Sequence, residues 1–138
     1  MIESAFFDTN IFLYAYSLDL ADAVKSGIAL EILTAYQPVV SSQILQEFIA
    51  NALRKPRLGI DEEKIDEFLG FTATLPICSL THDLIFHATA LRRSYGFSHW
   101  DSTVIAAAHA SGCVTLFSED LQHGFKLDHL TIINPFLR

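Results

Sequence analysis

The chain has 138 residues, a length typical of one domain, so we expect a single domain over 1–138. With 51% hydrophobic and only 18% charged residues, the composition excludes intrinsic disorder and suggests an apolar surface patch that a partner covers. Nine Lys and Arg against 16 Asp and Glu give a formal net charge of −7. That balance disfavours a nucleic-acid binder unless divalent cations offset some of the carboxylates.

Nothing in the sequence predicts a membrane protein or a secreted one. The longest apolar runs, such as 104–108, fall far short of the roughly 18–20 residues that cross a bilayer. The N-terminus carries Glu3 and Asp8 but no Lys or Arg, unlike a signal peptide. Cys78 and Cys113 are far apart and show no CxxC spacing, which predicts free buried thiols. We therefore expect a cytoplasmic protein.

Short β-rich apolar runs alternate with longer stretches of helical period, which is typical of an α/β protein with a mainly parallel sheet covered by helices. Five strands are predicted, at 4–8, 38–41, 76–79, 114–117 and 131–133. Helices are predicted at 10–18, 21–35, 42–55, from 61 onward, 81–95 and 98–111. In the second helix the expected apolar side comprises Val24, Ile28, Leu30, Ile32 and Leu33.

Acidic residues near the ends of these strands attract attention, because ligands of such sheets bind outside the carboxyl ends of the strands. Asp8 ends the first predicted strand between apolar neighbours. It is either a helix N-cap, a role open also to Thr9 and Asn10, or a buried carboxylate that needs a cation. Glu47 borders the apolar face of its helix, and a solvated helix glutamate explains it equally well.

Two further acids have the same double interpretation. The spacing from Ser98 to Asp101 resembles a capping box, yet Asp101 shares a helix face with an apolar stripe and so points toward the sheet. Asp120 follows the fourth strand, where Ser118 can act as an N-cap and Glu119 competes for any role given to Asp120. Converging carboxylates need cations or raised pKa values. Oxygen ligands without a Cys/His set favour Mg²⁺ or Mn²⁺ over Zn²⁺.

From Phe6 to about Pro135 the chain resembles PIN-domain proteins, of the kind found as the ribonuclease toxin of bacterial VapBC toxin–antitoxin pairs. The matching pieces are Phe7-Asp8-Thr9-Asn10, Glu47 in its helix, Ser98-His99-Trp100-Asp101 before an Ala-rich helix, and Ser118-Glu119-Asp120-Leu121-Gln122-His123-Gly124. The resemblance implies a three-layer α/β/α sandwich and an endoribonuclease dependent on Mg²⁺ or Mn²⁺. It also implies RNA as substrate, a homodimer and an antitoxin protein that holds the enzyme inactive.

By position, the resemblance makes four acids the catalytic and metal-ligating set: Asp8, Glu47, Asp101 and Asp120. Asp8 and Asp101 would be the central ligands, while Glu47 and Asp120 would be outer ligands or orient a water. Asn10 matches a polar residue often near the metal. Ser118 stands where the family often has Thr and keeps the hydroxyl.

The basic cluster Arg54, Lys55 and Arg57 is interpreted either as a grip on the RNA backbone or as favourable cations at a helix C-terminus. Trp100 is interpreted as part of the core or of a dimer interface rather than as a base-stacking platform. The alternative to a nuclease is a non-catalytic α/β interaction domain whose acids act only as helix caps. A receiver or a haloacid-dehalogenase-type phosphatase fits less well, since no Lys follows a late strand and 8–10 lacks a DxD motif.

Overall fold

The computed structural model describes residues 2–137. The strands are β1 Ser4–Phe7, β2 Gln37–Ser41, β3 Ile77–Cys78, β4 Thr115–Phe117, β5 Lys126–Leu127 and β6 Leu130–Ile133. The helices are α1 Thr9–Tyr16, α2 Ala23–Ala35, α3 Ser42–Arg54, α4 Glu62–Thr72, α5 His82–Tyr95 and α6 His99–Ala110, with short 3-10 turns η1 Leu20–Asp22 and η2 Pro56–Leu58. The single domain expected over 1–138 stays a prediction, and its first and last residues lie outside the described range.

These strands form one sheet in the order β3-β2-β1-β4-β6-β5. All neighbours pair in parallel except β5 with β6. The chain moves outward from β1 through β2 to β3 and then returns to the other side of β1 with β4. The direction of strand order therefore reverses between β1 and β4, which is where open α/β sheets bind their ligands.

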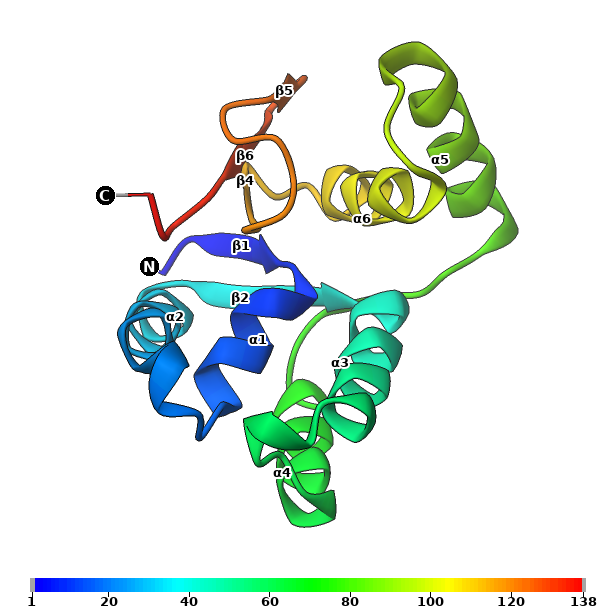
Figure 1. Ribbon diagram of the computed structural model, residues 1–138. Coiled ribbons are helices and arrows are strands. Elements are labelled where there is room, and N and C mark those ends of the chain that lie inside the picture. Colours follow the sequence, from blue (N-terminus) through cyan, green and yellow to red (C-terminus); the bar gives the residue numbers. More distant parts are fainter. Residues whose placement is uncertain (1, 138) are drawn as a thin grey trace.

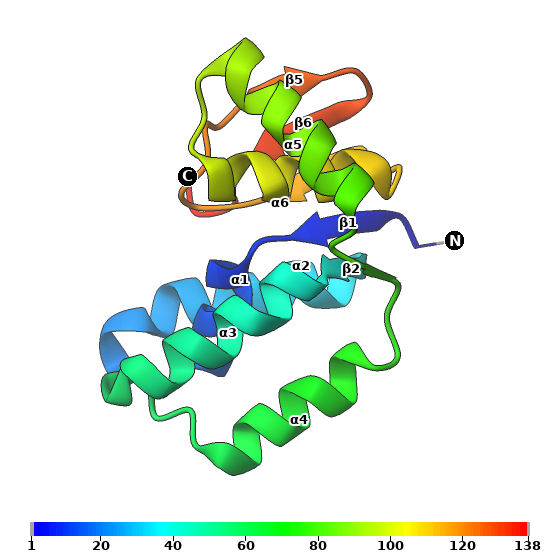
Figure 2. The same cartoon turned by 90° about the vertical axis from the view of Figure 1, so that its right-hand side faces the viewer.

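Helices cover the sheet on both faces, which confirms the predicted three-layer sandwich. Figure 1 shows α1, α2, α3 and α4 on one side of β1 and β2, and Figure 2 shows α5 and α6 on the other. The central strands are apolar on both faces, as buried parallel strands must be: Ala5, Phe6 and Phe7 are all fully buried. Below them Phe48 of α3 stacks on Phe68 of α4 with ring centroids 3.7 Å apart. The sequence pattern thus gave the right fold class.

The structure contains a sixth strand that the sequence pattern does not reveal. β5 has two residues and pairs antiparallel with β6, Lys126 opposite Thr131 and Leu127 opposite Leu130. A strand of two residues is too short for an alternation of apolar and polar positions to be detected. Over residues 2–137 no helix has the length and apolar character needed to span a bilayer.

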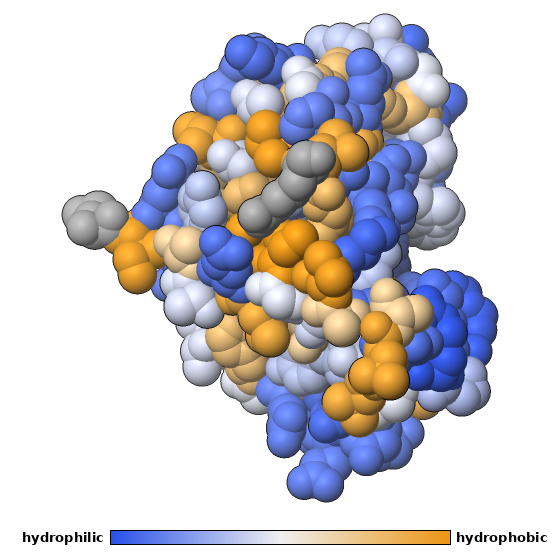
Figure 3. All heavy atoms as spheres, turned by 60° about the vertical axis from the view of Figure 1, so that its left-hand side comes forward, coloured by the Kyte–Doolittle hydropathy of each residue, from blue (hydrophilic) through white to orange (hydrophobic). Residues whose placement is uncertain are grey.

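Part of the expected apolar side of α2 faces outward. Ala29 is the buried residue of this helix, whereas Val24 is 77% exposed and Leu30 is also exposed. Leu20 of η1, just before α2, is more exposed still. Figure 3 brings the side of the molecule that carries α2 forward and shows apolar residues interspersed with polar ones on its surface. The apolar surface suggested by the composition is therefore present, and α2 contributes to it.

Candidate functional site

Asp8 lies directly after β1, at the point where the strand order reverses. It is the N-cap of α1, and its Oδ1 accepts a hydrogen bond from the backbone N–H of Thr9 at 2.8 Å. Its Oδ2 accepts a hydrogen bond from the hydroxyl of Ser118 at 2.7 Å. Ser118 follows β4, so this contact joins the carboxyl ends of two neighbouring strands. The cap interpretation and the site interpretation of Asp8 are therefore both compatible with its position.

Burial dominates the electrostatics of this carboxylate. Asp8 is only 7% exposed, and loss of solvation raises its pKa from the ordinary 3.8 to about 6. Hydrogen bonds from Ser118 and Thr9 lower the pKa, while the negative charges of Glu47 and Asp120 raise it further. A carboxylate in this setting is a site at which added positive charge is favourable.

Glu47 reaches the same region from α3. Its Oε2 accepts a hydrogen bond from the Thr9 hydroxyl at 2.9 Å, and its Oε1 accepts one from the Gln43 amide at 2.7 Å. The same Gln43 nitrogen lies 3.3 Å from the backbone oxygen of Trp100. The Glu47 carboxylate is therefore held by Thr9 of α1 and by Gln43 of its own helix. Gln43 in turn contacts Trp100, which connects this group to α6.

Asp101 and Asp120 complete the acidic set. The backbone N–H of Asp101 donates to the Ser98 hydroxyl at 3.1 Å, which confirms the N-cap, and its half-buried carboxylate makes no hydrogen bond with a described residue. Asp120 is exposed in the turn after β4, and its Oδ2 accepts a hydrogen bond from the Asn10 amide at 3.1 Å. Asn10 thereby orients the Asp120 carboxylate.

All four acids line one cavity of about 180 Å³ at the carboxyl end of the sheet. Its walls also include Thr9, Asn10, Asn51, Lys55, Trp100 and the apolar Leu13 and Val104. The carboxylates come from α6, α3 and the turns after β1 and β4, which are segments far apart in the sequence. Within residues 2–137, no three His, Cys, Asp or Glu side chains lie close enough to form a ready metal-binding group. The cavity brings the acids together without bringing them into direct contact.

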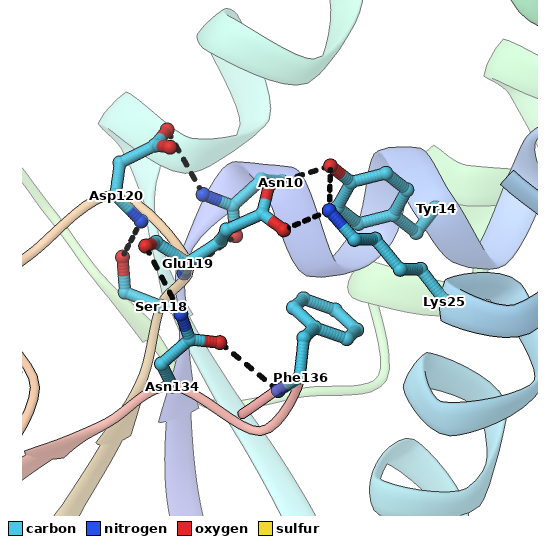
Figure 4. A network of polar contacts seen from close by, with 8 residues as sticks. All are labelled: Asn10, Tyr14, Lys25, Ser118, Glu119, Asp120, Asn134 and Phe136. Atoms are coloured by element: carbon cyan, nitrogen blue, oxygen red, sulfur yellow. Dashed lines mark hydrogen bonds and ion pairs between the residues drawn. The ribbon is translucent and has the colours of Figure 1, made fainter. Parts of the chain in front are cut away.

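Glu119, the alternative to Asp120, is not among the residues that line the acidic cavity. Its carboxylate accepts a hydrogen bond from the Tyr14 hydroxyl and forms an ion pair with Lys25. Figure 4 shows Glu119 directed toward Tyr14 and Lys25, whereas the Asp120 carboxylate is directed toward Asn10.

Ser118 joins the turn after β4 to the cavity. Besides donating to Asp8, its hydroxyl oxygen accepts the backbone N–H groups of Asp120 and Leu121, at 3.3 and 3.2 Å. Ser118 is fully buried, so each of these bonds is made in a region of low dielectric. The side chain therefore fixes both the Asp8 carboxylate and the backbone that carries Asp120.

The three residues of the basic cluster have different positions. Lys55 lines the acidic cavity. Arg57 forms ion pairs with Asp19 and Asp22 at 3.1 and 3.2 Å and lines a neighbouring cavity. Arg54 donates to Asn51 on its own helix. Of the three, Lys55 is placed best to contact anything held in the acidic cavity.

Sequence reasoning missed two residues that hold the acids, Thr9 and Gln43. Gln43 lies four residues before Glu47, so the usual pairing of i and i+4 on a helix could have revealed it. The Thr9 contact with Glu47 spans 38 positions and has no local signal. Trp100 was expected in the core or an interface, but its side chain is 62% exposed, which contradicts the core position.

Comparisons with known proteins agree with this architecture. A toxin–antitoxin complex from Klebsiella pneumoniae superposes with a TM-score of 0.68 and 20% identity, over 96% of this chain and 98% of that one. A VapC toxin from Mycobacterium tuberculosis that cleaves the sarcin–ricin loop superposes with a TM-score of 0.65 and 17% identity, over 84% of this chain and 91% of that one. A VapBC complex from Rickettsia felis bound to promoter DNA superposes with a TM-score of 0.64 and 19% identity, over 94% of this chain and 96% of that one. At these identities the likeness concerns the fold.

A comparison with curated proteins found no significant match. The family model of the PIN domain, in contrast, matches residues 5–126, which is most of the chain and includes the four acids that line the cavity. The match extends from β1, which carries the buried Asp8 at its end, into β5. The chain is therefore a member of the PIN-domain family.

Proposed function

We propose that this protein is a ribonuclease dependent on Mg²⁺ or Mn²⁺ that hydrolyses phosphodiester bonds of RNA, and that it serves as the toxin of a type II toxin–antitoxin pair. The observation that carries the proposal is the convergence of Asp8, Glu47, Asp101 and Asp120 on one small cavity at the switch point of a PIN-domain sheet. If the acids were only helix caps, nothing would require four separate segments to direct them into a common space.

The residues present suit a hard divalent cation. The donors around the cavity are carboxylate and amide oxygens, the ligand class that Mg²⁺ and Mn²⁺ prefer. Desolvation and the charges of Glu47 and Asp120 raise the pKa of Asp8, so a bound cation would relieve an unfavourable electrostatic situation. When bound, such ions lower the pKa of a coordinated water and stabilise charge on the phosphoryl oxygens.

The residues of this chain then have separate tasks. Asp8 and Asp101 would be the central ligands, Asp8 because it is buried and fixed, and Asp101 because its carboxylate has no competing hydrogen bond with a described residue. Glu47 and Asp120 would act as outer ligands or orient the attacking water. Each is already aligned by an amide side chain, Gln43 for Glu47 and Asn10 for Asp120.

Lys55 would contact the RNA backbone, because it supplies a positive charge to the wall of the acidic cavity. Arg54 and Arg57 are secondary candidates, and the ion pairs with Asp19 and Asp22 already engage Arg57. Bound divalent ions would offset part of the net charge of −7 and attract phosphates in their own right. An acidic chain can thus act on RNA.

The exposed apolar residues on the α2 side of the molecule favour protein partners, and we propose a homodimer and an antitoxin. The solved neighbours include toxin–antitoxin complexes, which supports the second of these. A cytoplasmic location fits the free Cys78 and Cys113. Mass measurement on the purified chain, alone and coexpressed with the product of an adjacent gene, tests both partners.

The nuclease proposal is tested by incubating the purified chain with total RNA in Mg²⁺, Mn²⁺ or excess EDTA. We expect cleavage with either metal and none with EDTA. Asp101→Asn should lower the cleavage rate by at least about 100-fold, because it removes a charged metal ligand. It should leave the fold intact, since the cap of α6 uses the backbone N–H of Asp101 and not its carboxylate.

Asp83→Asn is the matched control, because Asp83 also lies in the first turn of a helix, α5, but outside the acidic cavity. It should retain the cleavage rate of the unmodified chain. The assignment of the site would be refuted if Asp101→Asn and Asp83→Asn both cleaved RNA in Mg²⁺ or Mn²⁺ as fast as the unmodified chain.

A further inference from the structure

We propose that the groove beside the acidic cavity is a nucleobase subsite, in which one unstacked base of single-stranded RNA lies against the indole of Trp100. The inference rests on the proposed ribonuclease function, because it assigns the base next to the phosphate held by the acids. It names a substrate feature, single-stranded RNA with an unstacked base at one defined position, which the acids alone do not specify.

The groove has about 530 Å³ and lies between α3 and the start of α6. Its lining consists of Ser42, Gln43, Gln46, Glu47, Ala50, Leu80 and Trp100. Glu47 and Trp100 also line the acidic cavity, so the two spaces share a wall. A group held against Trp100 therefore lies next to whatever the acids hold, which is the arrangement expected for a base and its own phosphate.

The chemistry of the lining fits a base better than a backbone phosphate. Apart from Glu47, every lining side chain is uncharged, so no cation is available there to bind a phosphate. The apolar part is a flat aromatic ring with Leu80 and Ala50. Glutamine amides offer paired donor and acceptor atoms, which is how proteins read the edges of exposed bases.

Trp100 is exposed, and the ring of a neighbouring residue packs against its indole. Its side chain is 62% exposed, which is unusual for a large aromatic residue without a partner. The ring of His99 packs edge-on against it with centroids 4.8 Å apart, and the backbone oxygen of Trp100 accepts the Gln43 amide at 3.3 Å. An exposed indole offers an aromatic face on which a base can stack.

A second observation within the groove points to a missing hydrogen-bond donor. Gln43 is only 6% exposed, and its amide nitrogen faces two acceptors, the Glu47 carboxylate and the Trp100 carbonyl. Those contacts fix the orientation of the amide and leave Oε1 buried without a hydrogen-bond partner. A buried acceptor without a donor costs free energy. An exocyclic amino group, which adenine, cytosine and guanine all carry, is a donor that would satisfy this acceptor once the Gln43 side chain turns toward the groove.

Trp100 is the sole tryptophan of the chain, so its fluorescence reports on stacking directly. The probe is a short single-stranded oligoadenylate, titrated into the protein in excess EDTA so that binding is measured without cleavage. We expect quenching of the fluorescence, and its loss when one particular base is replaced by an abasic ribose. Trp100→Ala should weaken the affinity for a fluorescein-labelled form by about 5- to 150-fold, the range of one base–aromatic stack.

Two variants control this experiment. Trp100→Phe keeps an aromatic face and should recover most of the lost affinity. Phe86→Ala removes a similarly exposed aromatic side chain, 72% exposed on α5, that lines neither cavity, and it should bind as the unmodified chain does. Circular dichroism spectra and melting temperatures of all three variants verify that they are folded.

Two results would overturn the subsite: Trp100→Ala that binds oligoadenylate with unchanged affinity, or quenching that persists whichever base is removed. A loss of dimer mass in Trp100→Ala with unchanged RNA affinity would instead assign the groove to a protein interface. The proposed function fails separately, if the unmodified chain cleaves no RNA in Mg²⁺ or Mn²⁺ while the quenching and its loss in the abasic probe persist.

Discussion

Replacing Asp8 by Asn should stabilise the metal-free protein at neutral pH, although it removes a proposed metal ligand. The reason is the burial of the carboxylate, which raises its pKa from 3.8 to about 6 in the folded chain. Above pH 6 the folded protein must keep this group ionised in a desolvated position. Asparagine has nearly the same shape and no charge, so the free-energy cost of burying an ionised group disappears.

The size of the effect follows from the pKa. The difference between about 6 and 3.8, at about 1.4 kcal/mol for each pKa unit, makes the ionised group cost about 3 kcal/mol of stability. The substitution also loses the hydrogen bond in which the Ser118 hydroxyl donates to Oδ2, worth about 1 kcal/mol. The net gain of Asp8→Asn above pH 6 is therefore about 2 kcal/mol.

The dependence on pH has a definite sign. Below pH 3.8 the carboxyl is protonated in both folded and unfolded chains, so the penalty is absent and the variant is less stable by about 1 kcal/mol. Between pH 3.8 and about 6 the unfolded chain loses its proton first, and the unmodified protein loses stability relative to the variant. The two stabilities should cross within that interval.

Urea unfolding in EDTA at several pH values, followed by circular dichroism, measures both free energies. Saturating Mg²⁺ or Mn²⁺ should then stabilise the unmodified chain and not the variant, because ligand binding to the folded state adds stability. A variant that is less stable by a constant amount at every pH would contradict the argument, since it would mean that the Asp8 carboxylate carries no desolvation penalty.

Four other variants test single residues of the site and its surroundings. Ser118→Ala removes a hydrogen bond that lowers the pKa of Asp8, so the pH midpoint of the metal-induced rise in melting temperature should move upward. Asp120→Asn should slow RNA cleavage at least about tenfold, whereas Glu119→Gln should leave the rate unchanged and cost under about 1 kcal/mol in urea unfolding, because its ion pair is partly exposed. Lys55→Ala should weaken RNA binding in EDTA and reduce the slope of log affinity against log salt by about 1.

The sequence was sufficient where local patterns determine structure. Ser98 and Asp101 indicated a helix start, and the structure has that N-cap. The apolar run that ends at Asp8 indicated a strand with an acid at its carboxyl end, and the structure has that strand, with Ala5, Phe6 and Phe7 fully buried. Parallel strands end at one edge of a sheet, so acids after β1 and β4 were expected to lie near each other. The order of the strands, which places β4 beside β1, is known only from the structure.

Contacts between distant segments could not be derived in the same way. The hydrogen bond from Thr9 to Glu47 depends on how α3 packs against α1, and the exposure of Trp100 depends on which distant segments cover the start of α6. The periodicity of a helix marks its apolar positions but does not say which of them another element covers. For the same reason Val24 and Leu30 were expected to face the core and do not.

The outermost strands of the sheet, β3 and β5, have two residues each, and β5 begins with Lys126. Such short edge strands leave little free backbone for a strand of another molecule to pair with. A lysine on an edge strand makes this pairing less favourable. Despite its high content of hydrophobic residues, the folded chain should therefore resist aggregation by edge-to-edge pairing of its sheets. Any contact it makes with other proteins would use side chains on its helices rather than an extended sheet.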